Sequence, residues 1–181
     1  MKAPTTATLL FATMLVGCSS TRDASSSASE LAPLVVFLVR HAEKTDSGSD
    51  PELSAAGIER AAALARALRS AEIEQVHSSD FIRTRDTAGP VATEFGLQVA
   101  LYDPRDLPTL VAHLRKTGGR HLVVGHSNTT PVVVELLGGD PGSAIDEEGE
   151  YDRLYVVTVG LDGAVSSVMM HYGTPYSPVQ D

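Results

Sequence analysis

The feature that most constrains this chain is a pair of histidines, each at the end of a short apolar segment. Residues 34–39 (LVVFLV) lead into Arg40 and His41, and residues 122–125 (LVVG) lead into His126. A short apolar run that stops at polar residues is typical of a buried parallel strand. Open α/β sheets bind ligands at the carboxyl edge of such strands. The pattern predicts that two imidazoles and the Arg40 guanidinium meet in one cationic pocket, suited to phosphate chemistry.

From residue 31 onward the chain alternates strand-like and helix-like segments. Ser54 is a candidate helix N-cap, Pro131 stands at the tolerated first position of a helix, and Asp162-Gly163 predicts a hairpin turn. The alternation predicts one α/β domain, a three-layer α/β/α sandwich with a mostly parallel sheet that is antiparallel at one edge. Strands are expected near 34–39, 73–77, 97–101, 121–125, 155–159 and 165–172, and helices near 55–68, 81–94, 107–116 and 130–137.

The first 17 residues predict a lipoprotein signal peptide. Lys2 precedes an apolar stretch, residues 8–16, that is too short to span a bilayer. The stretch ends in Leu15-Val16-Gly17-Cys18, which resembles the bacterial lipobox, where the cysteine is lipidated. An ordinary secretory signal or a short anchor helix are the alternatives. Cys18 is the only cysteine, so we expect no disulfide, no thiol nucleophile and no thiolate metal site.

The rest of the chain divides into a Ser/Ala-rich tether (18–31), a catalytic domain (32–175) and a short C-terminal tail (176–181). Serines follow Cys18 and no Asp stands beside it, which resembles sorting to the Gram-negative outer membrane. We therefore expect a cell-envelope protein, lipid-anchored at the periplasmic face of that membrane. The net charge of −9 argues against nucleic acid as a partner and against a polybasic membrane contact. The lipid would be the only contact with the membrane.

A third segment, residues 76–88, places Arg83 in the first turn of a predicted helix, just after a strand. The free N–H groups and positive dipole end of such a turn favour an anion. The planar guanidinium of arginine also matches phosphate oxygens. Taken alone, Arg83 could equally be a surface residue paired with Asp86. Arg85 points to another side of the helix, and we expect it to be solvated or structural.

Two metal-based interpretations of the first histidine segment are open. His41-x-Glu43 also occurs in zinc deaminases, but the Pro-Cys-x-x-Cys sequence that completes their site is missing. A metal site made by His41, Glu43 and His126 lacks a third histidine at ligand spacing. Neither metal site is favoured.

The second histidine segment has a different alternative. Residues 125–129 (GHSNT) nearly match the Gly-x-Ser-x-Gly elbow of α/β-hydrolases, with Ser127 as the nucleophile. Thr129 stands where the tight turn of that elbow needs glycine, and no glycine run for an oxyanion loop lies upstream. A serine hydrolase would also leave Arg40 and His41 without a task.

Taken together, the three segments resemble the histidine phosphatase superfamily, also called phosphoglycerate mutase-like. The carriers are a strand followed by Arg40-His41-x-Glu43, then Ser79-x-x-x-Arg83-Thr84 about forty residues later, then a strand followed by Gly125-His126. The resemblance spans residues 34–172. In size it is similar to the short phosphohistidine-phosphatase-like branch.

The resemblance implies a phosphatase that hydrolyses a phosphomonoester or phosphoramidate through a phosphohistidine on His41. Arg40, Arg83 and His126 would bind the phosphoryl oxygens of a phosphorylated small molecule or phosphoprotein, and no metal or other cofactor would be required. Nearby arginines would keep His41 neutral and balance the charge of the transition state.

The general acid is not evident from the sequence. Ser127 follows His126 at the position where the acid-phosphatase branch carries an Asp proton donor. Asp103 is the tentative candidate, and Glu43 and Asp106 are the others. Without an acid, only substrates with good leaving groups, such as phosphoramidates or aryl phosphates, would react well. A phosphate-binding pseudoenzyme is therefore the main alternative to a phosphatase.

Overall fold

The computed structural model describes Met1 and residues 32–178. The expected signal peptide, Cys18 and the whole of the tether (18–31) lie outside the described residues. Residues 32–178 belong to one compact unit. Within the described part of the chain, no helix is both long enough and apolar enough to cross a membrane.

Six strands form one mixed sheet in the order β3-β2-β4-β1-β5-β6. Strand β1 pairs in parallel with β4, β4 with β2, and β2 with β3, whereas β5 runs antiparallel to both β1 and β6. The expected mostly parallel sheet with antiparallel pairing at one edge is confirmed. The strands are β1 (Leu34–Arg40), β2 (Gln75–Ser79), β3 (Val99–Tyr102), β4 (Gly119–Gly125), β5 (Arg153–Val159) and β6 (Val165–His171).

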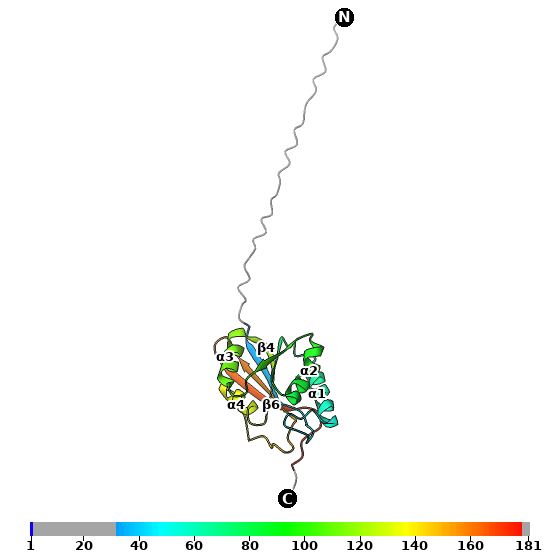
Figure 1. Ribbon diagram of the computed structural model, residues 1–181. Coiled ribbons are helices and arrows are strands. Elements are labelled where there is room, and N and C mark those ends of the chain that lie inside the picture. The colour runs from blue at the N-terminus through cyan, green and yellow to red at the C-terminus, as the bar shows by residue number, and fades with distance from the viewer. Residues whose placement is uncertain (2–31, 179–181) are drawn as a thin grey trace. The chain divides into compact units, whose positions relative to one another are not determined.

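Helices cover both faces of the sheet, so the three-layer sandwich is also confirmed (Figure 1). Helices α1 (Ala55–Leu68) and α2 (Ile82–Glu94) pack on one face, where Leu64 and Val91 share a core with Val39 of the sheet. Helices α3 (Leu107–Thr117) and α4 (Thr130–Leu136) pack on the other, where Leu114 and Val133 share a core with Leu38. Strands buried on both faces explain the apolar runs in the sequence.

Two strands lie further along the chain than expected. Strand β3 begins at Val99 rather than Leu97, because the Leu97 N–H is bonded to the Ala92 carbonyl at 2.8 Å and closes the end of α2. Gly96 has a φ of 65° there, and the Gly96 N–H bonds the Thr93 carbonyl, which is the pattern of a Schellman cap. Strand β2 was expected near residues 73–77 and instead spans Gln75–Ser79. Its last residue, Ser79, is part of the candidate site.

The start of α1 is fixed against the loop that follows β1. The Ser54 N–H donates to the Glu43 carbonyl at 2.9 Å, and the Ser54 hydroxyl accepts from the Gly57 N–H at 3.2 Å. The Gly57 backbone lies so close to this loop that a Cβ atom there would be 2.1 Å from the Glu43 carbonyl oxygen. Glycine is required at this position by a backbone contact, which cannot be relieved by a rotamer change.

Replacing Gly57 by alanine should therefore destabilise the domain, although alanine has the higher helix propensity. We expect a loss of at least about 2 kcal/mol in the free energy of unfolding, because the overlap forces backbone atoms apart. Urea denaturation of Gly57→Ala measures the effect. The control is Ile58→Ala, the next residue of α1, whose side chain is 62% exposed and should matter by less than about 0.5 kcal/mol. A Gly57→Ala protein as stable as the wild type would contradict this view of the contact.

Candidate active site

The two histidines singled out by the sequence lie side by side, because β1 and β4 are neighbours in the sheet. Arg40 is in register with Gly125, and the His41 N–H donates to the Gly125 carbonyl at 2.9 Å. The rings of His41 and His126 approach edge to face, with centroids 5.4 Å apart. Both imidazoles therefore lie at the carboxyl edge of the parallel strands, where a ligand site was expected.

The hydrogen bonding of His41 fixes which nitrogen can react. Nδ1 lies 2.8 Å from the Ala42 carbonyl oxygen, which can only accept, so Nδ1 carries the proton. The ring is 4% exposed, and burial, with the charges of Arg40 and Arg83 and a contribution from His126, lowers the pKa of His41 to about 3. At neutral pH the ring is uncharged, and its lone pair is on Nε2. This is the form of an imidazole that acts as a nucleophile.

His126 is oriented by Ser79, which the sequence analysis named only as part of a motif. The Ser79 hydroxyl donates to Thr84 Oγ1 at 3.1 Å, so it accepts from His126 Nε2 at 2.9 Å. The ring of Phe81 packs edge-on against the His126 ring, with centroids 5.0 Å apart. Burial, then the charges of Arg83 and Arg40, lower the pKa of His126 to about 4. An anion bound at Nδ1 would favour the protonated form of His126. The positively charged ring would then donate a hydrogen bond to the anion from Nδ1.

Arg40 is held by the backbone of one loop. Its Nη1 donates to the carbonyls of Asp146 and Glu150 at 2.9 Å each, and its Nη2 donates to the Glu147 carbonyl at 2.5 Å. The guanidinium also stacks on Tyr151, 4.0 Å from the ring centre. Its Nε is buried and has no hydrogen-bond partner among the described residues. A buried N–H without a partner is costly, and an anion would satisfy it.

Arg83 has the same unsatisfied atom. Its Nη1 lies 3.4 Å from Asp50 Oδ1, so its acidic partner is Asp50 and not Asp86 as considered from the sequence. Its guanidinium lies 4.5 Å from the ring centre of Phe81. Its Nε is likewise buried without a partner in the part of the chain that the structure describes. Arg83 and Arg40 both lower the pKa values of His41 and His126, so the two cations lie near both rings. Together these groups form a site able to bind a tetrahedral oxyanion.

The carboxylates considered as acids are engaged elsewhere. Glu43 forms an ion pair with Arg60, with a shortest distance of 2.7 Å. Asp103 is exposed and bonded to Arg105 at 2.9 Å, which holds its pKa below the usual range. Asp106 caps α3 by accepting from the Thr109 N–H at 3.3 Å. Within residues 32–178, no hydrogen bond or ion pair joins these carboxylates to His41 or His126.

The interpretations based on Ser127 and on a metal find no support in the geometry. His126 is hydrogen-bonded to Ser79, and no hydrogen bond joins Ser127 to a histidine among the described residues. Residues 32–178 also contain no group of three or more His, Cys, Asp or Glu side chains arranged to hold a metal ion.

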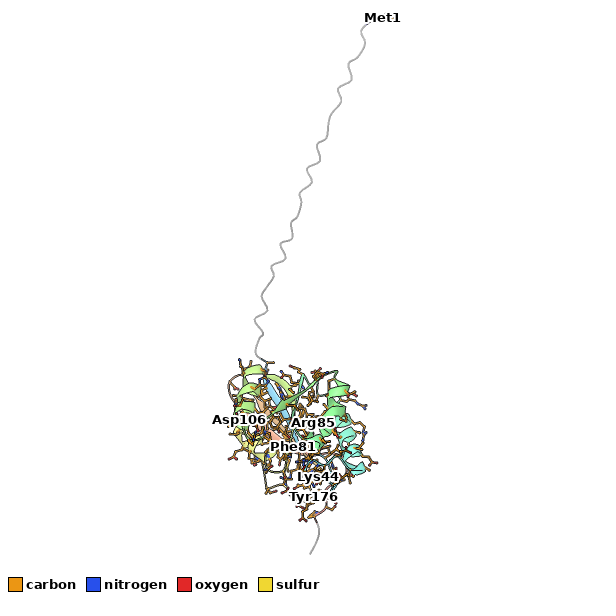
Figure 2. The ribbon with its side chains drawn as sticks, in the orientation of Figure 1. Met1, Lys44, Phe81, Arg85, Asp106 and Tyr176 are labelled. Carbon is orange, nitrogen blue, oxygen red and sulfur yellow. The ribbon has the colours of Figure 1, made fainter. Side chains whose placement is uncertain are left out.

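The loop that holds Arg40 is fastened by the end of the domain, which the sequence did not reveal. Tyr176, placed in the tail by the sequence analysis, donates from its hydroxyl to Asp146 Oδ2 at 2.6 Å and from its N–H to Asp152 Oδ2 at 2.8 Å. Glu150 is fixed by an ion pair with Arg153 at 2.6 Å. Tyr176 lies at the lower end of the domain in Figure 2. The folded domain thus extends past residue 175, to Tyr176 at least.

Comparisons with known proteins agree with this arrangement. Residues 36–104 match the family model of the histidine phosphatase superfamily (branch 1). The protein histidine phosphatase SixA, solved with tungstate, has a TM-score of 0.64 at 20% identity, covering 76% of this chain and 97% of that chain. A mycobacterial glucosyl-3-phosphoglycerate phosphatase has a TM-score of 0.58 at 17% identity, covering 77% and 98%. Among curated proteins, no sequence matches this chain.

Proposed function

We propose that this chain is a phosphatase of the histidine phosphatase superfamily, that His41 is its nucleophile and that a phosphohistidine is its intermediate. The observation that carries the proposal is the hydrogen bond from His41 Nδ1 to the Ala42 carbonyl, which leaves the lone pair on Nε2. The guanidinium groups of Arg40 and Arg83, whose Nε atoms have no partner among the described residues, lie near enough to lower the pKa of His41. A nucleophile and two groups able to bind an oxyanion are thus close together.

The proposed reaction has two steps. His41 Nε2 forms a bond to phosphorus while the bond from phosphorus to the leaving atom breaks, and the leaving atom keeps the electron pair and takes a proton from solvent water. Water then attacks the phosphohistidine, which releases inorganic phosphate and restores neutral His41. Arg40, Arg83 and protonated His126 balance the charge on the phosphoryl oxygens in both transition states, the largest contribution to this kind of catalysis.

We propose that the substrate is a phosphoramidate, or a phosphomonoester with a good leaving group. The support is that Glu43, Asp103 and Asp106 are each occupied by an arginine or a helix N-terminus. A leaving group that departs easily needs little help from a positioned acid. The solved relative that acts on protein phosphohistidine breaks a bond of this type.

Substituting His41 should abolish the covalent intermediate. We expect His41→Ala to lose on the order of a thousandfold or more in kcat, because the whole two-step path depends on the nucleophile. Quenching a reaction with labelled acetyl phosphate or p-nitrophenyl phosphate should trap an acid-labile, base-stable adduct in the wild type only. An adduct that persists in His41→Ala would place the nucleophile elsewhere.

Arg83 and Arg85 lie two residues apart on α2 and provide a matched pair. Arg83→Met removes a proposed contact to the phosphoryl group and should lower kcat/KM by about a hundredfold. Arg85 is paired with exposed Asp80, and Arg85→Met should change kcat/KM by less than about threefold. Equal losses in the two variants would mean that general charge, not a contact at the site, is responsible.

The pH profile should reflect the lowered pKa values of the histidines. With the pKa of His41 at about 3, the reactive neutral form persists well below the ordinary histidine pKa of 6.5. After correction for ionisation of the substrate, kcat/KM should show no acid limb near pH 6.5 and should fall only as the pH approaches the His41 pKa of about 3. Circular dichroism at each pH confirms that the domain stays folded. An acid limb near 6.5 would contradict a buried, neutral nucleophile.

We further propose that Cys18 carries the lipid that anchors the enzyme to the cell envelope, at the periplasmic face of the outer membrane. The support is Leu15-Val16-Gly17-Cys18, followed by a Ser/Ala-rich segment without nearby acidic residues until Asp23. More than one acyl chain makes such an anchor durable. Cys18→Ser should leave the protein unprocessed or release it from the membrane fraction. Normal processing and unchanged membrane fractionation of the variant would reject the anchor.

A further inference from the structure

A second pocket, distinct from the residues of the proposed catalytic site, lies between edge strand β3 and helix α3. Its volume is ≈ 450 Å³, within the range of small-molecule sites. Ala100 and Tyr102 of β3, His77 of β2, and Leu110 and His113 of α3 line it. The proposed phosphatase mechanism uses none of these side chains.

Two buried histidines beneath this pocket have a defined hydrogen-bond direction. His121 Nε2 lies 2.6 Å from the Gly118 carbonyl oxygen, which can only accept, so Nε2 carries the proton of His121. Burial lowers the pKa of His121, so its other nitrogen, Nδ1, is a bare acceptor at neutral pH. His77 Nε2 lies 3.0 Å from this acceptor and therefore donates to it.

This chain of donors leaves one acceptor facing outward from the pair. Burial, then a contribution from the neighbouring histidines, lowers the pKa of His77 to about 4, so the neutral ring carries its lone pair on Nδ1. Nδ1 has no hydrogen-bond partner among the described residues. His77 is 3% exposed and lines the pocket. His77 thus brings an unpaired acceptor to the pocket, and its ring is held by stacking on His121, with ring centroids 5.2 Å apart.

The other polar groups of the pocket restrict the ligand further. The carboxylates of Asp103 and Asp106 line the same pocket and are exposed. Asp103 is paired with Arg105, so the charge that favours a cation comes from Asp106. Among the described residues, the Asp106 carboxylate accepts one hydrogen bond, from the Thr109 N–H. The Tyr102 hydroxyl donates to the Val124 carbonyl at 3.2 Å, so its proton is not available to a ligand. Ala100 and Leu110 contribute apolar surface. The complement of this lining is a flat apolar body with a hydrogen-bond donor at one end and a cation at the other.

We propose that this pocket is a binding site for a small aromatic cation that bears a hydroxyl or ring N–H. The donor bonds to His77 Nδ1, the ring lies over Ala100 and Leu110 beside His113, and the cation lies near Asp106. This site goes beyond the phosphatase reaction, because no bond of the ligand is broken there.

Binding of tyramine to the full-length protein tests the proposal. Tyramine carries a phenolic donor and an ammonium group, and its binding can be followed by saturation-transfer NMR and titration calorimetry. 2-Phenylethylamine lacks the hydroxyl, and 4-hydroxyphenylacetate reverses the charge. We expect each of the two analogues to bind about five- to tenfold more weakly than tyramine, the effect of losing one hydrogen bond or one charge contact.

A pair of variants ties the binding to this pocket. Ala100→Leu fills the pocket from the exposed edge strand and should reduce tyramine binding by at least tenfold. Gln98→Leu adds an apolar side chain to the same edge, outside the pocket, and should leave the affinity unchanged. No binding of tyramine, equal binding of all three probes, or undiminished binding to Ala100→Leu would each overturn the proposal. Because the readout is direct binding, these outcomes are independent of whether His41 is the nucleophile.

Discussion

The pairing of β1 with β4 is the constraint on which the candidate active site depends. Between the end of β1 and the start of β4 lie 78 residues, yet the register of the two strands sets Arg40 opposite Gly125 and so puts His41 beside His126. The hydrogen bond from the His41 N–H to the Gly125 carbonyl continues the ladder one step beyond the strands. A shift of one residue would turn the side chains of β1 to the opposite faces of the sheet. The apolar cores on both faces therefore protect the geometry of the site as well as the fold.

The site also shows how an acidic chain can maintain a cationic pocket. Arg40 is held by three backbone carbonyls, which orient its guanidinium without cancelling its charge. Arg60, by contrast, is neutralised by a carboxylate of Glu43 and serves to join α1 to the loop after β1. Carbonyl acceptors leave the positive potential available to a substrate, whereas a bidentate carboxylate would compete with it. The difference explains how a chain with a net charge of −9 can present an oxyanion site.

Much of this organisation could be predicted from the sequence, because apolar runs mark the strands and capping residues mark the helix ends. The apolar runs before Arg40 and His126 indicated which strand ends carry the histidines, and Ser54 marked the start of α1 within one residue. What could not be predicted are contacts through the backbone. The carbonyls of residues 146–150 that hold Arg40 have no signature in residue type, and neither does the role of Ser79 beside His126. Glu43 could be named as an acid, but its pairing with Arg60 of α1 depends on tertiary geometry. The pairing of Asp103 with Arg105 is local, yet residue types alone do not show that it forms.

The loop that holds Arg40 is synthesised long after Arg40 itself. Arg40 emerges from the ribosome 106 residues before Asp146, the first of its carbonyl acceptors, and still earlier than Tyr176, which fastens that loop. Until those residues have been synthesised, the apolar strand β1 ends in Arg40 without the carbonyl groups that hold its guanidinium. Its neighbour in the sheet, β4, begins only at residue 119. Contacts so distant in sequence form late and leave apolar strand edges open in the meantime. The nascent chain therefore exposes the apolar strand β1 well before the residues that pair with it and hold Arg40.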